Sequence, residues 1–313
     1  MELFKVILNP MLTLFICIIV GFILKKAKIL PDNADKVISK IETFVLCPAV
    51  SFSSFSKYCT VESFKQYYVL LLYSIGACLF ALLISNLIAR FFEKGDEYRR
   101  NIYKYALTIG NIGFMGIPLV SMVLGEKAVF IYQFFNLPLT FTIYLWGYTM
   151  LTPKEKRKKN PIKNLFNPGL TAIFIGMIVG LTGLGQNLPT FATNTLTSLS
   201  NCMAPLAMIL TGFVVGGYKY KDLFLNVKVY IASILRLIVI PAVIVTLLYL
   251  CKASETCLIM ALFAYATPLG LNTVVFPASF GAETKTGASM AIISHTLSVL
   301  TIPLMYTLLN LIL

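Results

Sequence analysis

Long apolar segments separated by short polar connections run along the whole chain. An apolar segment of roughly 17–25 residues is long enough to cross the hydrocarbon core of a bilayer as an α-helix. The pattern predicts ten such segments, at residues 5–24, 36–56, 67–91, 103–124, 128–151, 168–185, 192–216, 229–250, 255–280 and 286–312. No stretch with the composition of a soluble domain is left between them. We therefore predict an all-α polytopic membrane protein with ten transmembrane helices.

The overall composition agrees with this prediction. Of the 313 residues, 58% are hydrophobic and only 12% are charged, and the mean hydropathy is +0.83. A soluble domain carries a charge at about a quarter of its positions. The first segment has a short polar region before it and lacks a clear small-residue cleavage site. We therefore expect it to be a membrane span rather than a signal peptide.

The basic residues are distributed unevenly between the connections. Of the 26 lysines and arginines, 20 lie at the connections after the first, third, fifth, seventh and ninth segments, and five lie on the opposite side. Basic residues concentrate on the cytoplasmic side of membrane proteins. We expect a multi-pass protein of the cell membrane with both termini outside and the basic loop 153–167 in the cytoplasm. Topology accounts for the net charge of +13, so no nucleic-acid partner is expected.

The chain contains two related halves. The stretch NPMLTLFICIIVG starts at Asn9, and the stretch NPGLTAIFIGMIVG starts at Asn167. The same register, with an offset of 157–159 residues, matches Leu30-Pro31 with Leu188-Pro189, Pro48 with Pro205, and Pro118 with Pro277. Each half holds five predicted spans, and an odd number makes the second half enter from the other side of the membrane. We predict a first five-helix repeat at 1–152, a loop at 153–167 and an inverted five-helix repeat at 168–313.

The fourth predicted span contains the stretch GNIGFMGIPL at residues 110–119. Pro118 lacks a backbone donor and clashes with the preceding turn, so the helix is expected to open near Gly113–Gly116. The ninth span contains a similar set of residues, with Pro268, Gly270, Asn272 and Pro277, and is expected to be interrupted in the same way. Backbone that is open at membrane depth must be buried by protein or line a watery cavity. The alternative is that these residues only kink the helices for packing.

The two broken helices are expected to cross near the bilayer midplane, where many secondary transporters bind their substrate. Exposed amides at half-helix N-termini attract anions. Asn111 and Asn272 add neutral groups that can hold a carboxylate, and two further amides lie about one turn apart on the fifth span. The predicted substrate-binding residues are Ser51, Asn111, Gly113, Pro118, Gln133, Asn136, Pro268, Asn272 and Pro277.

Few ionisable residues lie inside the predicted spans, and such residues are functional candidates. Glu42 either carries a coupling proton or pairs with Lys36 or Lys40 near the membrane surface. His295 hydrogen-bonds the substrate, relays a proton, or is a packed, hydrogen-bonded histidine. Arg236 either balances the charge of an anionic substrate or extends its guanidinium to the interface.

With these residues, the sequence resembles the auxin efflux carrier family, which includes the plant PIN carriers and many bacterial carriers described as malate or malonate permeases. The pattern of Asn111, three residues and then Met-Gly-Ile-Pro-Leu is similar to the family's motif in the crossing fourth helix. The resemblance covers the whole chain. It implies two inverted five-helix repeats with crossing helices 4 and 9, often a homodimer, and elevator-like transport of small organic anions. The basic loop lacks the long insert of many plant members, which argues against auxin as the physiological substrate.

No catalytic, cofactor-binding or metal-binding pattern occurs in the sequence, so we predict a transporter and not an enzyme. The absence of a P-loop argues against an ATP-driven pump. The predicted function is therefore secondary transport of small carboxylates, such as malate, malonate or auxin-like anions. One alternative is a sodium-coupled carrier of the bile-acid-transporter type, although neither crossing helix contains an acidic residue. The other alternative is a membrane sensor that binds a ligand without transporting it.

Overall fold

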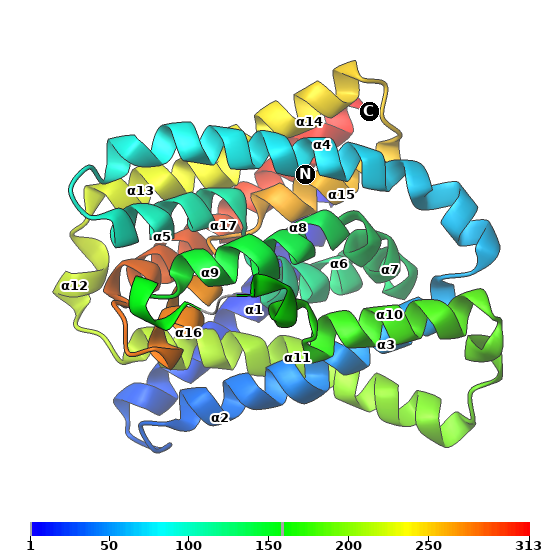
Figure 1. Ribbon diagram of the computed structural model, residues 1–313, viewed down its shortest axis with the longest axis horizontal. Coiled ribbons are helices and arrows are strands. Elements are labelled where there is room, and N and C mark those ends of the chain that lie inside the picture. The colour runs from blue at the N-terminus through cyan, green and yellow to red at the C-terminus, as the bar shows by residue number, and fades with distance from the viewer. Residues whose placement is uncertain (1, 158–159) are drawn as a thin grey trace.

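The structure of the protein is a computed structural model that describes residues 2–157 and 160–313 (Figure 1). Within these residues the chain is helical, and its one β-type contact is an isolated antiparallel bridge between Gly110 and Leu269. The α-helices of the first half are α1 (Glu2–Lys26), α2 (Ala34–Ile41), α3 (Cys47–Tyr58), α4 (Val61–Phe92), α5 (Glu97–Thr108), α6 (Ile117–Leu124), α7 (Glu126–Phe135), α8 (Leu137–Thr142) and α9 (Tyr148–Leu151).

The second half has a similar series of helices. They are α10 (Pro168–Leu181), α11 (Thr190–Gly216), α12 (Tyr220–Phe224), α13 (Val227–Ile234), α14 (Ile240–Leu250), α15 (Glu255–Ala266), α16 (Asn272–Ser279) and α17 (Lys285–Ile312). Wider π-helical turns form η1 (Glu42–Leu46), η2 (Ile112–Gly116), η3 (Ile143–Gly147) and η7 (Leu235–Val239), and short 3₁₀ turns form η4 (Lys154–Lys156), η5 (Pro161–Leu165) and η6 (Leu184–Asn187).

The structure supports a multi-pass membrane protein. In the described part of the chain, six helices are long and apolar enough to cross a membrane, or seven if the pair Glu126–Phe135 and Leu137–Leu151, bent by 55°, forms one span. The predicted fourth, sixth and ninth spans correspond to shorter or broken helices. For example, α10 has 14 residues and is about 21 Å long, which is less than the roughly 30 Å of a bilayer core. The number of ten spans therefore stays a prediction.

The fourth and ninth predicted spans are interrupted, as the sequence indicates. In the first half, α5 ends at Thr108 and the next helical turn begins at Ile112. In the second half, α15 ends at Ala266 and α16 begins at Asn272. The prediction that the first break lies near Gly113–Gly116 is wrong, because these residues form part of the π-helical turn η2 and the open backbone precedes them.

Three of the π-helical turns directly precede a proline. A proline has no N–H group, and its ring clashes with the carbonyl four residues earlier in an α-helix. A turn widened by one residue moves that carbonyl away from the ring. The turns η1, η2 and η7 end two residues before Pro48, Pro118 and Pro241, respectively. Pro118 therefore widens its own helix, and the open segment lies one turn further toward the N-terminus.

Two pairs of helices from different halves pack closely against each other. The helix α1 packs against α11, and α3 packs against α10. A Cβ atom at Gly21 of α1 would collide with the main chain of Ile209, and a Cβ atom at Gly180 of α10 would collide with the carbonyls of Phe55 and Cys59. Glycine at these two positions allows close approach of the helix backbones, which favours packing in a membrane. The repeated Val-Gly ending of the sequence motif therefore has a structural role in both halves.

Figure 1 shows how these elements are arranged. The helices α2, α3, α10 and α11 lie along the lower side of the view, and α4, α13 and α14 lie along the upper side. The broken segments lie between them, with α5 packed against α4 and α15 packed against α14. The residues of the open segments, such as Ile109, Asn111, Thr267 and Leu269, are buried by protein, as is required at membrane depth.

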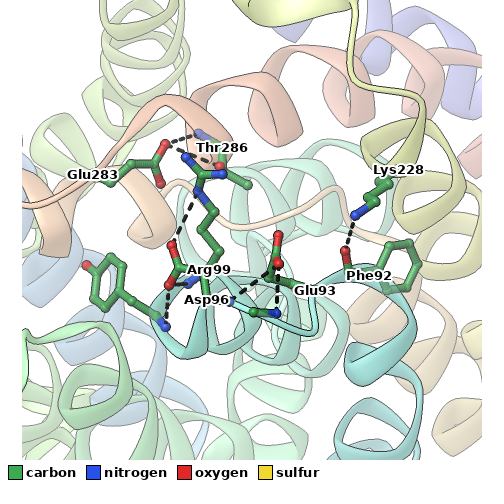
Figure 2. Close-up of polar contacts among 9 residues, drawn as sticks. Phe92, Glu93, Asp96, Arg99, Lys228, Glu283 and Thr286 are labelled. Carbon is green, nitrogen blue, oxygen red and sulfur yellow. Dashed lines mark hydrogen bonds and ion pairs between the residues drawn. The ribbon is translucent and has the colours of Figure 1, made fainter.

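Side chains fix the helix ends at the connection between α4 and α5 (Figure 2). Asp96 caps α5 by accepting hydrogen bonds from the main-chain N–H groups of Tyr98 and Arg99 at 2.9 and 3.1 Å. At the start of the same helix, Lys154 donates a hydrogen bond to Glu97 at 2.8 Å, which lowers the pKa of that carboxyl group. These contacts hold the N-terminal end of α5 at this connection, and the break follows the other end of the helix, at Thr108.

Candidate functional site

The two interrupted helices meet through their open backbones. The bridge between Gly110 and Leu269 joins the two extended segments in antiparallel orientation. The main-chain N–H of Asn111 donates a hydrogen bond to the carbonyl of Pro268 at 2.7 Å. The N–H of Leu269 donates to the hydroxyl of Ser294 at 3.0 Å. The crossing point therefore satisfies part of the polar backbone that the helix breaks release.

A cavity of about 190 Å³ lies beside this crossing. Six of the nine predicted substrate-binding residues line it: Ser51, Asn111, Gly113, Gln133, Asn136 and Asn272. The lining also contains polar side chains that were not predicted to bind substrate, namely Thr43, Cys47, Tyr132, Thr140, Tyr144 and Asn167. No Asp, Glu, Lys or Arg is among the described residues of the lining. The cavity is therefore polar but carries no side-chain charge.

The side-chain amides of Gln133, in α7, and of Asn136, the residue that follows α7, each have one hydrogen-bonding group without a partner in the described part of the chain. The hydroxyl of Ser51 donates to Oε1 of Gln133 at 2.7 Å. This bond fixes the amide, and Nε2 of Gln133 is buried without a partner in the described part of the chain. Nδ2 of Asn136 donates to the carbonyl of Tyr132 at 2.8 Å, and its Oδ1 is likewise buried without a partner there. A buried polar group without a partner is costly unless a ligand or water completes it.

Asn111 is joined to His295 of α17. Nδ1 of the imidazole lies 2.7 Å from the carbonyl of Ala291, which can only accept, so Nδ1 carries the proton. Nε2 then accepts a hydrogen bond from Nδ2 of Asn111 at 3.2 Å. His295 itself is buried and is not in the lining of the cavity. The histidine therefore orients the amide of Asn111 from behind.

Asn272, the first residue of α16, donates a hydrogen bond from Nδ2 to the hydroxyl of Tyr105 at 2.9 Å. In the sequence, the match of Pro118 with Pro277 gives an offset of 159 residues between the halves. With that offset, Asn111 corresponds to Gly270 and not to Asn272. Asn272 nevertheless reaches the same cavity, because it starts the helix that follows the break.

The three predicted prolines lie outside the lining of this cavity. Pro118 lines a second cavity of about 390 Å³, between α1, α3, α6, α7 and α11. Pro268 contributes its carbonyl to the crossing, and Pro277 is buried within α16. These prolines shape the backbone around the site, and none of them lines it.

Glu42 and Arg236, two of the three buried ionisable residues that the sequence analysis placed inside the spans, are both enclosed by protein. The side chain of Glu42 is fully buried, and neither of its oxygens has a partner among the described residues, so the predicted pairing with Lys36 or Lys40 is wrong. The side chain of Arg236 is also fully buried, so its predicted extension to the interface is wrong. Arg236 instead donates hydrogen bonds to main-chain carbonyls near the crossing.

Comparison with known proteins identifies the family. A family model described as "Membrane transport protein" matches residues 6–306. The chain belongs to the membrane transport protein family. This family contains the auxin efflux carriers, so the resemblance based on the fourth-span motif is confirmed. The chain is also similar to an uncharacterized transporter of Methanocaldococcus jannaschii, with 27% identity over 303 residues that cover 95% of this chain and 97% of that protein.

Membership in the membrane transport protein family agrees with the helical architecture and the apolar spans. The match extends over both halves of the chain, including both interrupted helices. The protein is therefore a multi-pass membrane transporter.

Proposed function

We propose that the protein is a secondary transporter of small organic anions and that the substrate binds in the cavity at the crossing. The observation that carries this proposal is the buried amide N–H of Gln133, which has no partner among the described residues and lies in a cavity whose described lining has no acidic side chain. A carboxylate oxygen accepts hydrogen bonds from amide donors, and such bonds to a charged group are stronger than neutral ones. A cation or a purely apolar ligand would leave this donor unsatisfied.

The size and the local backbone also favour a small anion. The cavity of about 190 Å³ is smaller than the roughly 300–1,000 Å³ of sites that bind drug-sized ligands. The helical run Ile112–Leu124 begins beside the cavity, and Gly113 in its first turn is part of the lining. The N-terminal end of a helix carries a partial positive charge and free N–H groups. Small mono- and dicarboxylates, including malate- and malonate-like anions, fit these properties.

We also propose that the two halves are inverted repeats, each with five spans. The first span of each half packs against the second span of the other half, as α1 with α11 and α3 with α10. An antiparallel bridge between corresponding positions, such as Gly110 and Leu269, is the contact that a two-fold axis in the membrane plane generates. These reciprocal contacts support the repeat boundaries at 152 and 168.

In this proposal the group of helices α1, α3, α10 and α11 forms a scaffold, and the helices around the crossing carry the substrate past it by an elevator-type movement. The cavity of about 390 Å³ and the cavity of about 190 Å³ at the crossing are both lined in part by α6. Each cavity separates part of the scaffold from part of the helices around the crossing. We propose both termini outside, the basic loop 153–167 in the cytoplasm, and a homodimer formed through the scaffold. The charge distribution and the family membership support this arrangement.

The proposal also concerns which ion, if any, is coupled to transport. A sodium site needs several oxygen ligands, usually with acidic side chains, and the described lining of the cavity has none. An ionised carboxylate is costly to bury without a partner, so the buried Glu42 fits a site that takes up a proton. We therefore propose transport that is proton-linked or independent of ions, rather than sodium-coupled.

Uptake into proteoliposomes tests the function. The purified protein is reconstituted, and the uptake of radiolabelled acetate, malonate, malate and indole-3-acetate is measured with and without a sodium gradient and a proton gradient. We expect saturable uptake of at least one carboxylate, and we expect that this uptake does not require sodium. A strict sodium requirement would favour the bile-acid-transporter alternative. Saturable binding without uptake would favour a sensor, and neither binding nor uptake of any carboxylate would refute the proposal.

A further inference from the structure

Arg236 contacts the ends of both interrupted helices. It lies in the π-helical turn η7, and its side chain is fully buried. Nη1 donates hydrogen bonds to the carbonyls of Leu107 at 3.3 Å and Thr108 at 3.1 Å, at the C-terminal end of α5. Nη2 donates to the carbonyl of Ala264 at 3.0 Å, in the last turn of α15. One guanidinium group therefore joins the two helix ends that face each other at the crossing.

The charge of Arg236 is balanced by backbone rather than by a carboxylate. None of the ion pairs between described residues includes Arg236. The last carbonyls of a helix have no partner within the helix, and they carry about half of a negative charge. Two helix ends together supply roughly one negative charge, which matches one guanidinium. The ring of Tyr265 adds a cation–π contact, with Cζ of Arg236 5.4 Å from its centroid.

The carbonyls that Arg236 binds, at the C-terminal ends of interrupted helices, have a common role in transporters with such helices. Such proteins commonly use unwound carbonyls and half-helix C-terminal ends to coordinate a coupling cation. Here the guanidinium already occupies the carbonyls of both ends. We propose that Arg236 is a built-in cation that replaces a bound coupling cation at the crossing and so allows the neighbouring cavity to bind an anion without sodium. This inference rests on the proposed function of the cavity.

The packing links Arg236 to the cavity. A Cβ atom at Gly110 would collide with Nη2 of Arg236 and with the hydroxyl of Thr267. The guanidinium therefore lies directly against the bridge residue, and the next residue along the chain, Asn111, lines the cavity. Without the positive charge, two helix ends of partial negative charge would face the bound carboxylate at short range. Arg236 thus acts as a positioning residue that does not itself line the cavity.

Equilibrium binding of radiolabelled malonate, or of the panel carboxylate with the highest uptake, tests the inference. Arg236→Met removes the charge and keeps a long side chain, and Arg236→Lys restores the charge. Arg90→Met, at an exposed position of α4, is a control with the same change in charge. We expect at least about a tenfold loss of affinity in monodisperse Arg236→Met, recovery to within about fivefold in Arg236→Lys, and no change in the control.

The native protein provides a second test that does not depend on the folding of a variant. Its affinity for the same carboxylate should be equal in sodium chloride and in choline chloride of the same ionic strength. A tenfold weaker affinity in choline, equal losses in the Met and Lys variants, or unchanged affinity in Arg236→Met would each overturn the inference. If the native protein binds no carboxylate in either salt, the proposed function fails instead, so the two failures are distinguishable.

Discussion

The amide of Gln133 offers the sharpest test of the cavity. The hydroxyl of Ser51 fixes Oε1 of this side chain at 2.7 Å, and Nε2 is the buried group without a partner in the described structure. Gln133→Met keeps a similar volume and removes the donor. If Nε2 binds the substrate carboxylate, the variant loses one hydrogen bond to a charged group, which contributes about 1.5–3 kcal/mol. The affinity should therefore fall by about 10- to 150-fold.

Ser51→Ala tests the same contact from its other end. It leaves the amide in place but removes the bond that orients it, and a neutral hydrogen bond contributes about 0.5–1.5 kcal/mol. The expected loss of affinity is about 2- to 10-fold. In a Gln133→Met background, Ser51→Ala should have little further effect, because there is no amide left to orient. A double-mutant cycle measures this coupling.

The assay is equilibrium binding of the same radiolabelled carboxylate to purified, monodisperse protein in detergent. Gln66→Met, an exposed position of α4, controls for the chemical change. Thermal unfolding of each variant shows whether the fold is retained. Affinity of Gln133→Met within twofold of the native protein, in a variant that unfolds normally, would refute the assignment of this cavity as the carboxylate site.

The sequence predicts the polar lining of the cavity well for a physical reason. An amide or hydroxyl in an apolar helix avoids lipid, so it faces protein or a cavity. Six polar or glycine positions from four separate predicted spans consequently meet in one place. The interrupted helices are predictable for a similar reason, because proline and glycine at matching positions of both halves disfavour a continuous helix.

The exact position of the break was not predictable from Pro118 alone. A proline disturbs the carbonyl four residues before it, which suggested an opening at Gly113–Gly116. In the structure a π-helical turn absorbs that disturbance, and the backbone opens earlier, where the main chain of Asn111 finds the carbonyl of Pro268. This partner is far away in the sequence, so local rules do not reveal it.

The roles of Arg236 and His295 depend on long-range contacts in the same way. Arg236 bonds carbonyls 129, 128 and 28 residues away, and His295 bonds an amide 184 residues away. A single sequence shows that each is a polar residue in an apolar span, but it does not show what each one contacts. Both residues hold the crossing from outside the cavity; the sequence left open whether Arg236 faces the substrate or extends to the interface, and whether His295 contacts the substrate or is a packed, hydrogen-bonded histidine.

Three further predictions concern topology, coupling and the crossing. In a background without the exposed Cys202 and Cys251, a cysteine at Lys163 should be labelled only from the cytoplasm and one at Leu313 only from outside; labelling of both from one side would refute the inverted arrangement. Glu42→Gln should abolish uptake driven by a proton gradient and spare exchange, whereas the exposed control Glu62→Gln should change neither. Asn111→Ala removes the donor to Nε2 of His295 and leaves that nitrogen buried without a partner, which should lower the stability by about 1–3 kcal/mol. The same change removes an amide from the cavity lining, so the folded fraction should also bind the carboxylate at least about tenfold more weakly. Lower stability with normal affinity would show that Asn111 only supports the crossing, because the histidine bond and the cavity are separate contacts of one side chain.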